Sequence, residues 1–436
     1  MRTFRTSSID AGRPAAMAAA MLVHLDAAER ASAATVESTS RSRTAAQPLG
    51  APMKAARIVY FLTIVLVSAC RHNASASEND TPPPIPTIDA AASVGYFYVG
   101  GRYVAENGAR VMQGAMYVEV LRPRRVAHRY PLVLIHGAGQ TGTNWLGTPD
   151  GRQGWAQYFL TRGYILYVVD QPARGRSAWH PGVDGELKSV PASLVEKLFT
   201  APEEFGAWPQ AQKHSQWPGN GRLAGHMGDP VFDAFYSTQV ESLASNTETQ
   251  KLVQSAGAAL LDRIGPAILL THSQAGAFGW LIADARPKLV KGIIAVEPFG
   301  PPFRDAVLGD GKARPWGLAD IELTYDPPVK TPDELDIVQQ ERPDAPDLYP
   351  CWLQSEPARR LSNLASIPIM VVTSEASYHA VYDHCTARYL RQVGAQVDFV
   401  RLEGVGIHGN GHMMMLETNN MAIAGIIARW ADTSIR

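Results

Sequence analysis

A serine with small neighbours lies between a predicted strand and a predicted helix, which is the arrangement that a nucleophilic serine needs. Residues 267–270 are apolar and β-prone, and the segment Thr-His-Ser-Gln-Ala-Gly follows at 271–276. Apolar side chains then recur at helical spacing, at positions 278, 281, 282 and 285. A serine on a sharp strand-to-helix turn projects its hydroxyl clear of the backbone. We therefore expect Ser273 to be a nucleophile, and a serine that only caps a core helix is the alternative.

A glycine-rich loop follows a second predicted strand. Residues 131–135 are largely apolar, and they lead into His-Gly-Ala-Gly-Gln-Thr-Gly at 136–142. Glycines let backbone N–H groups face a ligand without side chains in the way. In an acyl-transfer enzyme, the N–H of Ala138 would pair with that of Gln274 to bind the oxyanion of a tetrahedral intermediate. A phosphate-binding loop is the alternative, but the Lys-Ser or Lys-Thr pair of such loops does not follow.

Along the chain, the glycine-rich loop comes first, the serine motif second and a histidine late. This order resembles that of the α/β-hydrolase superfamily. Segments 170–177, 296–298 and 409–415 resemble, more narrowly, a small bacterial esterase family whose acid is a glutamate after the strand that follows the nucleophile. The resemblance covers most of the chain from about Ser93 onward. It implies an α/β fold with a mostly parallel central sheet and helices on both faces, which the order of predicted strands and helices also favours, after an early antiparallel hairpin at 96–121.

The resemblance also indicates the base and the acid. The family has its histidine just ahead of the terminal helix, which implies His412, and His408 in the same loop is expected to order the loop or contact substrate. The acid is expected to be Glu297, which ends a strand in the rigid sequence Val-Glu-Pro. Glu375 follows another predicted strand and is the reserve acid, because the carboxyl ends of parallel strands meet at one crevice.

These residues predict a serine carboxylic-ester hydrolase that acts on a small-molecule ester through an acyl-enzyme. A lactonase, thioesterase or amidase would use the same residues, and a non-catalytic ligand-binding lipoprotein is a further alternative. We expect no metal and no cofactor, since the usual zinc spacings and cofactor signatures do not occur. The balance of 40 basic and 41 acidic residues argues against a nucleic-acid partner. The oligomeric state is left open.

Two long irregular stretches, at about 178–257 and 299–361, interrupt the alternation of strands and helices and are rich in aromatic residues. Both follow the carboxyl ends of predicted strands, so we expect them to form a cap over the catalytic crevice. Gly139, Asn144 and Trp145, in and after the glycine-rich loop, are expected to wall the substrate pocket.

The N-terminal part predicts export. Residues 1–52 are rich in Ala, Ser, Thr and Arg and are expected to be an untranslated or disordered extension. From Met53, two basic residues, an apolar run at 58–67 and small residues describe a signal peptide that is too short to span a membrane. Leu-Val-Ser-Ala-Cys at 66–70 resembles the lipobox of bacterial lipoproteins, which implies a lipid on Cys70 and a membrane anchor. A plain secretory signal and an uncleaved anchoring segment are the alternatives.

The rest of the chain is expected to be a proline-rich tether at 71–92 and one hydrolase domain at 93–436, with its two insertions. The chain has three cysteines. If Cys70 carries lipid, Cys351 and Cys385 remain, and an oxidising compartment favours a disulfide between them. Two buried free thiols are the alternative.

Overall fold

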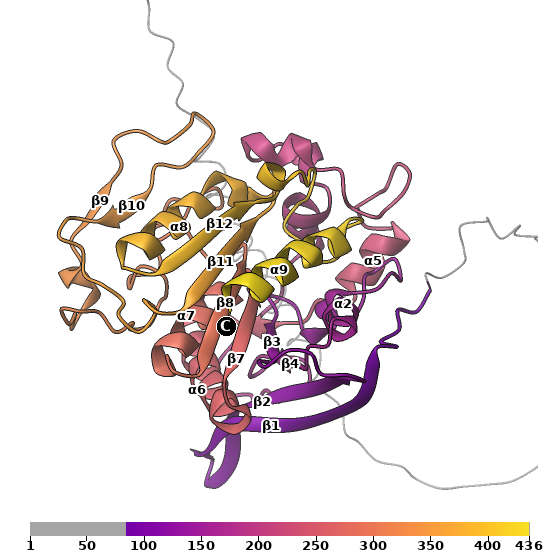
Figure 1. The fold of residues 1–436 in the computed structure, drawn as a ribbon, viewed down its shortest axis with the longest axis horizontal. Coiled ribbons are helices and arrows are strands. Elements are labelled where there is room, and N and C mark those ends of the chain that lie inside the picture. The colour runs from indigo at the N-terminus through magenta and orange to yellow at the C-terminus, as the bar shows by residue number, and fades with distance from the viewer. Residues whose placement is uncertain (1–83, 436) are drawn as a thin grey trace, which may run out of the picture. The chain divides into compact units, whose positions relative to one another are not determined.

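An eight-stranded sheet forms the centre of the computed structural model, which describes residues 84–435 (Figure 1). The strand order is β1-β2-β4-β3-β7-β8-β11-β12. β1 (Ala91–Glu106) and β2 (Ala109–Pro123) form a long antiparallel hairpin, and β2 is antiparallel to β4 (Leu166–Asp170). The other pairs are parallel and join β3 (Leu132–Ile135), β7 (Ala267–His272), β8 (Val290–Val296), β11 (Pro368–Thr373) and β12 (Gln396–Arg401). The predicted fold class and the early hairpin are confirmed.

The parallel strands are buried on both faces, which explains their nearly continuous apolar sequences. Along β7, Ala267 and Leu269 belong to one hydrophobic core, whereas Ile268 and Leu270 belong to the other. The first core lies against α6 (Asn246–Ile264), α7 (Ala275–Ala285) and α8 (Asp383–Gln392). The second lies against α2 (Trp155–Thr161) and α9 (Asn420–Ser434). The sheet is therefore the middle of three layers.

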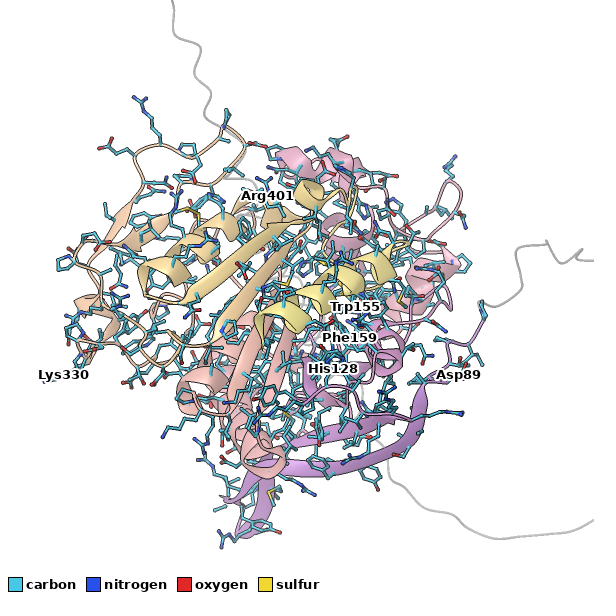
Figure 2. All side chains as sticks on the ribbon, in the orientation of Figure 1. Asp89, His128, Trp155, Phe159, Lys330 and Arg401 are labelled. Carbon is cyan, nitrogen blue, oxygen red and sulfur yellow. A yellow bond between two sulfur atoms is a disulfide. The ribbon has the colours of Figure 1, made fainter. Side chains whose placement is uncertain are left out.

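The helix α2 is fixed to α9 by two large aromatic side chains. Trp155 and Phe159, labelled in Figure 2, are fully buried in the core that α2 shares with α9, and the Trp155 indole donates a hydrogen bond to the Asn420 carbonyl at 2.9 Å. This contact holds the start of α9 in place, directly after the loop that carries His412.

The first insertion follows β4 and consists of short elements. These are β5 (Leu187–Lys188), α3 (Ala192–Val195), η2 (Glu196–Thr200), α4 (Pro202–Phe205), η3 (Pro209–Lys213), α5 (Pro230–Tyr236) and β6 (Ser242–Leu243). It ends earlier than the predicted 257, because Ser245 caps α6 by accepting a hydrogen bond from the Glu248 N–H at 3.2 Å. Phe199 of this insertion stacks on His412, with ring centroids 5.1 Å apart, so the insertion covers that side chain.

The second insertion, after β8, contains η4 (Pro332–Glu334), β9 (Ile337–Gln339) and β10 (Trp352–Gln354). Its buried aromatics Trp316 and Tyr325 belong to the core on the α8 side, where the Tyr325 hydroxyl bonds that of Tyr389 at 2.6 Å. Most of this insertion therefore packs against the body of the domain, and the expectation that it forms a cap is wrong for that part. None of the described helices is long and apolar enough to cross a membrane.

The second insertion is also covalently tied to α8. Cys351 and Cys385 form a disulfide with their Cα atoms 5.1 Å apart, which confirms the predicted pair. The predicted signal peptide, Cys70 and the extension 1–52 lie outside the described residues.

Candidate active site

Ser273 lies on the turn between β7 and α7 in a backbone conformation that non-glycine residues rarely adopt, with φ 54°. The turn is held on both sides, because the Ser273 N–H donates to the Val296 carbonyl at 3.0 Å and the Phe299 N–H donates to the Ser273 carbonyl at 2.8 Å. Gly276 is required for this close approach, since a Cβ there would lie 2.4 Å from the Cβ of Pro298. Such strain, fixed by the surroundings, is typical of a nucleophile on a strand-to-helix turn.

His412 and Glu297 form a buried pair at the same end of the sheet. The Nδ1 of His412 lies 2.5 Å from Oε2 of Glu297, and both side chains are almost fully buried. Glu297 directly follows β8 and has a positive φ of 45°. Its carboxylate also accepts hydrogen bonds from the Ser374 N–H and hydroxyl, at 2.8 and 2.7 Å, and from the Ser377 hydroxyl at 2.7 Å. These donors fix the carboxylate in the orientation that His412 needs.

The pair also sets the protonation of the imidazole. A carboxylate can only accept, so Nδ1 of His412 carries the proton and Nε2 keeps a free lone pair. Burial, together with the neighbouring ring of His379, lowers the pKa of His412 well below its ordinary value. The His379 ring stacks on that of His412, with centroids 4.8 Å apart and an angle of 7° between the ring planes. His412 is therefore a neutral ring with an available acceptor atom, which is the state that a general base requires.

Tyr378, in η5 (Tyr378–Val381), lies beside His412. Its hydroxyl is 3.4 Å from Nε2 of His412, and the nearby Ser273 side chain influences its pKa. The sequence analysis missed this residue, although it belongs to the loop after β11 in which the reserve acid Glu375 was proposed. A tyrosine in such a loop gives no sequence signal comparable to that of a carboxylate after a strand.

The glycine-rich loop places the predicted oxyanion amides beside the serine turn. Gly139 has a positive φ of 68°, and within residues 84–435 neither the Ala138 N–H nor the Gln274 N–H donates a hydrogen bond to another backbone carbonyl. Both amides belong to loop ends near Ser273, because a Cβ on Gly137 would lie 3.1 Å from the Cβ of Ser273. The two N–H groups are thus free for an external acceptor.

The peptide that carries the Ala138 N–H is held through its oxygen. The Gly137 carbonyl accepts from Nη1 of Arg174 at 3.0 Å and from Nδ1 of His136 at 2.9 Å. The Gln171 N–H donates to Nε2 of His136 at 3.1 Å, which fixes the ring as the Nδ1–H tautomer. Burial and the Arg174 charge lower the pKa of His136 to about 3, so the ring stays neutral. A peptide plane held at its carbonyl fixes the direction of its N–H.

A model of the alpha/beta hydrolase family matches residues 132–425. A probable secreted lipase, phiG, from Fungal sp. (strain ATCC 74256) is 47% identical over 371 residues, which are 85% of this chain and 97% of that protein. The chain belongs to the alpha/beta hydrolase family. The predicted superfamily is therefore confirmed. Among solved structures, a novel bacterial esterase solved at atomic resolution is similar in fold, with 23% identity, a TM-score of 0.52, and coverage of 81% of this chain and 99% of that one.

Several residues proposed for this hydrolase site lie elsewhere in the structure. Glu375 does not contact His412; its carboxylate lies 3.0 Å from Nδ1 of His408 and 3.2 Å from Nζ of Lys213. The His408 side chain is 64% exposed. Among the described residues, the structure thus pairs Glu297, and not Glu375, with the predicted base.

The three residues that were predicted to wall the substrate pocket do not lie together around one pocket. Trp145 is fully buried and packs on Trp155 with centroids 5.7 Å apart, so its indole belongs to the core and not to an exposed wall. Asn144 lines a hollow of about 230 Å³ together with Phe235, and Ser273 is not among the residues that line it. Gly139 stays beside the site, where its carbonyl accepts from the Val240 N–H of the first insertion at 2.8 Å.

Two groups of side chains in the described part of the chain have the spacing of a metal site: Glu297, His379 and His412, and Cys351, His384 and Cys385. In the first, the Glu297 carboxylate already accepts four hydrogen bonds, one of them from His412. In the second, both sulfurs are joined in the disulfide. Neither donor set is available for a metal as it stands.

Proposed function

We propose that this protein is an exported serine carboxylic-ester hydrolase that works through an acyl-enzyme. The observation that carries the proposal is the buried 2.5 Å contact between His412 and Glu297, next to a strained serine turn. Ser273, His412 and Glu297 supply the nucleophile, base and orienting acid of a triad. The printed names of the fungal lipase and the bacterial esterase agree with an ester as substrate.

The proposed reaction assigns one step to each of these groups. The Ser273 hydroxyl attacks the ester carbonyl carbon while its proton passes to Nε2 of His412. The negative oxygen of the tetrahedral intermediate accepts hydrogen bonds from the Ala138 and Gln274 amides. His412 then gives the proton to the departing alcohol as the carbon–oxygen bond breaks. A water molecule, deprotonated by His412, attacks the acyl-enzyme and releases the acid.

Labelling with a fluorophosphonate tests this proposal. We expect the purified wild-type protein to be labelled at Ser273 and to hydrolyse short p-nitrophenyl esters, and Ser273→Ala to lose both properties. His408→Ala, in the exposed part of the histidine loop, is the matched control and should keep both. A wild-type protein that is not labelled, or an Ser273→Ala variant that still hydrolyses the esters, would refute the proposal.

The type of bond and the anchor need separate tests. A panel of esters, lactones, thioesters and anilides with the same acyl group distinguishes an esterase from a lactonase, thioesterase or amidase. The segment 53–70 supports export, and the fungal relative is named as secreted. A lipid on Cys70 is a further proposal, and an unmodified peptide spanning Ala69 and Cys70 in the mature exported protein would exclude it.

A further inference from the structure

The Tyr378 hydroxyl contacts the proposed base, His412, and has no role in the mechanism above. It lies 3.4 Å from Nε2 of His412, and it is near enough to Ser273 for that side chain to influence the pKa of Tyr378. The alcohol oxygen of an ester must come close to this same Nε2, because it receives its proton there. The tyrosine hydroxyl therefore borders the position of the leaving group.

The tyrosine is held firmly in this position. Its ring is buried and packs edge-on against Trp208 of the first insertion, with centroids 5.9 Å apart. The preceding residue, Ser377, accepts a hydrogen bond from the His379 N–H at 3.1 Å and donates to Glu297 at 2.7 Å. The start of η5 is thus tied to the acid of the triad, so that the hydroxyl has little freedom to move away from His412.

The hydroxyl is a donor throughout the reaction. Burial and the Glu297 charge raise the pKa of Tyr378 far above its ordinary value, so it keeps its proton. In the free enzyme, the single lone pair of Nε2 of His412 can accept from this hydroxyl or from that of Ser273. After His412 has taken the serine proton, Nε2 is itself a donor, and the tyrosine must direct its O–H to another oxygen.

We propose that Tyr378 is a catalytic residue that donates a hydrogen bond to the alkoxy oxygen of the ester as the leaving group departs. This proposal rests on the proposed function. The carbon–oxygen bond breaks with its electron pair moving to the alkoxy oxygen, His412 supplies the proton, and Tyr378 keeps its own. The tyrosine stabilises the charge that develops on this oxygen before the proton arrives, and so it matters most when the alcohol is a poor leaving group.

A series of acetate esters with alcohols of increasing pKa, from p-nitrophenol to ethanol, tests the role. In Tyr378→Phe we expect acylation with alkyl esters to fall by about 10- to 100-fold, and acylation with p-nitrophenyl acetate to change by less than about threefold. The rate should therefore depend more steeply on the leaving-group pKa than in the wild type. Tyr382→Phe is the matched control, since this buried tyrosine lies in the same segment, and it should keep the wild-type dependence.

Fluorophosphonate labelling separates this proposal from the proposed function. Tyr378→Phe should be labelled at close to the wild-type rate, because fluoride leaves readily without a donor. If all esters slow by the same factor, if none slows, or if the variant is no longer labelled, the leaving-group role is wrong, whereas a wild-type protein without labelling would refute the proposed function itself.

Discussion

Two buried histidines near the carboxyl end of the sheet each contact a buried glutamate, yet their charges differ. His412 contacts Glu297, and burial with the adjacent His379 lowers its pKa well below the ordinary value. His214, in the first insertion, lies 2.7 Å from Glu203 and 3.0 Å from Glu417. Burial alone would favour its neutral form, but the hydrogen bonds to the two carboxylates outweigh this effect and raise its pKa to about 9.

The second ring nitrogen accounts for the difference. In His214 both nitrogens contact carboxylate oxygens, which only accept, so both must carry protons and the ring is a cation. In His412 only Nδ1 contacts a carboxylate, and Nε2 faces the Tyr378 hydroxyl instead. A buried histidine–glutamate pair is therefore either a base or a fixed charge, depending on what lies at the other nitrogen.

The His214 cation connects the cap to the catalytic loop, and we call Glu203, His214 and Glu417 the cap bridge. Glu417 also accepts from the Gly411 N–H at 2.8 Å, one residue before His412. A Cβ on Gly411 would lie 2.9 Å from Cδ2 of His214, so the bridge requires glycine there. The bridge thus holds the loop that carries His412.

The largest effect is expected at Glu297, the proposed acid of the triad. Glu297→Gln should lower kcat by about 10³- to 10⁴-fold, because an amide no longer holds His412 in the Nδ1–H tautomer and cannot stabilise its cation. Steady-state hydrolysis of a p-nitrophenyl ester measures this change. Glu375→Gln is the control, with an expected change of less than about threefold, since Glu375 pairs with His408 and Lys213. The reverse ranking of the two variants would show that Glu375 is the acid.

The cap bridge should affect stability more than chemistry, and its effect should depend on pH. The folded-state pKa of His214 is raised, so its contribution is complete below the ordinary value of 6.5 and is lost as the pH rises through about 9. A shift of this size corresponds to roughly 3 kcal/mol of unfolding free energy. We expect the wild type to lose this amount between about pH 7 and 10 in urea unfolding, and His214→Gln to lose much less over that range.

Glu417→Gln provides the second arm of this experiment. It removes one negative charge from beside the ring, and its single amide oxygen can still accept from the Gly411 N–H. Its alkaline loss of stability should be intermediate between those of the wild type and His214→Gln. Identical pH profiles for all three proteins would show that His214 is not charged in the folded state.

The predictions from sequence were most successful for the order of the strands and for residues that follow strand ends. The predicted class of fold and the hairpin depend on apolar runs and their order, which are local properties of the chain. Glu297 and His412 were expected from a resemblance, and the structure brings them into contact. Their roles remain predictions that the variants above test.

Other features depend on contacts between distant segments and left no local signal. The partners of His214 lie 11 and 203 residues away along the chain. Trp145 was expected to wall the pocket, but it packs on Trp155 in the core. The sequence does not distinguish an aromatic residue that faces a substrate from one that faces the core. The first insertion was predicted to end at about 257, but α6 already begins after its N-cap Ser245.

The smallest effect is expected in the pH dependence of activity, which depends on the protonation of His412. Because the pKa of His412 is lowered, Nε2 stays unprotonated as the pH falls through 6.5. We expect kcat/KM to remain on its plateau at pH 6.5 and to decline only at a lower pH. A fixed-pH titration of released acid measures this limb without reliance on the colour of nitrophenolate. His214→Gln should show the same acid limb, since the cap bridge is charged throughout this range. A decline centred at or above pH 6.5 in the wild type would mean that His412 is stabilised as a cation, and the contrast between the two histidines would then be wrong.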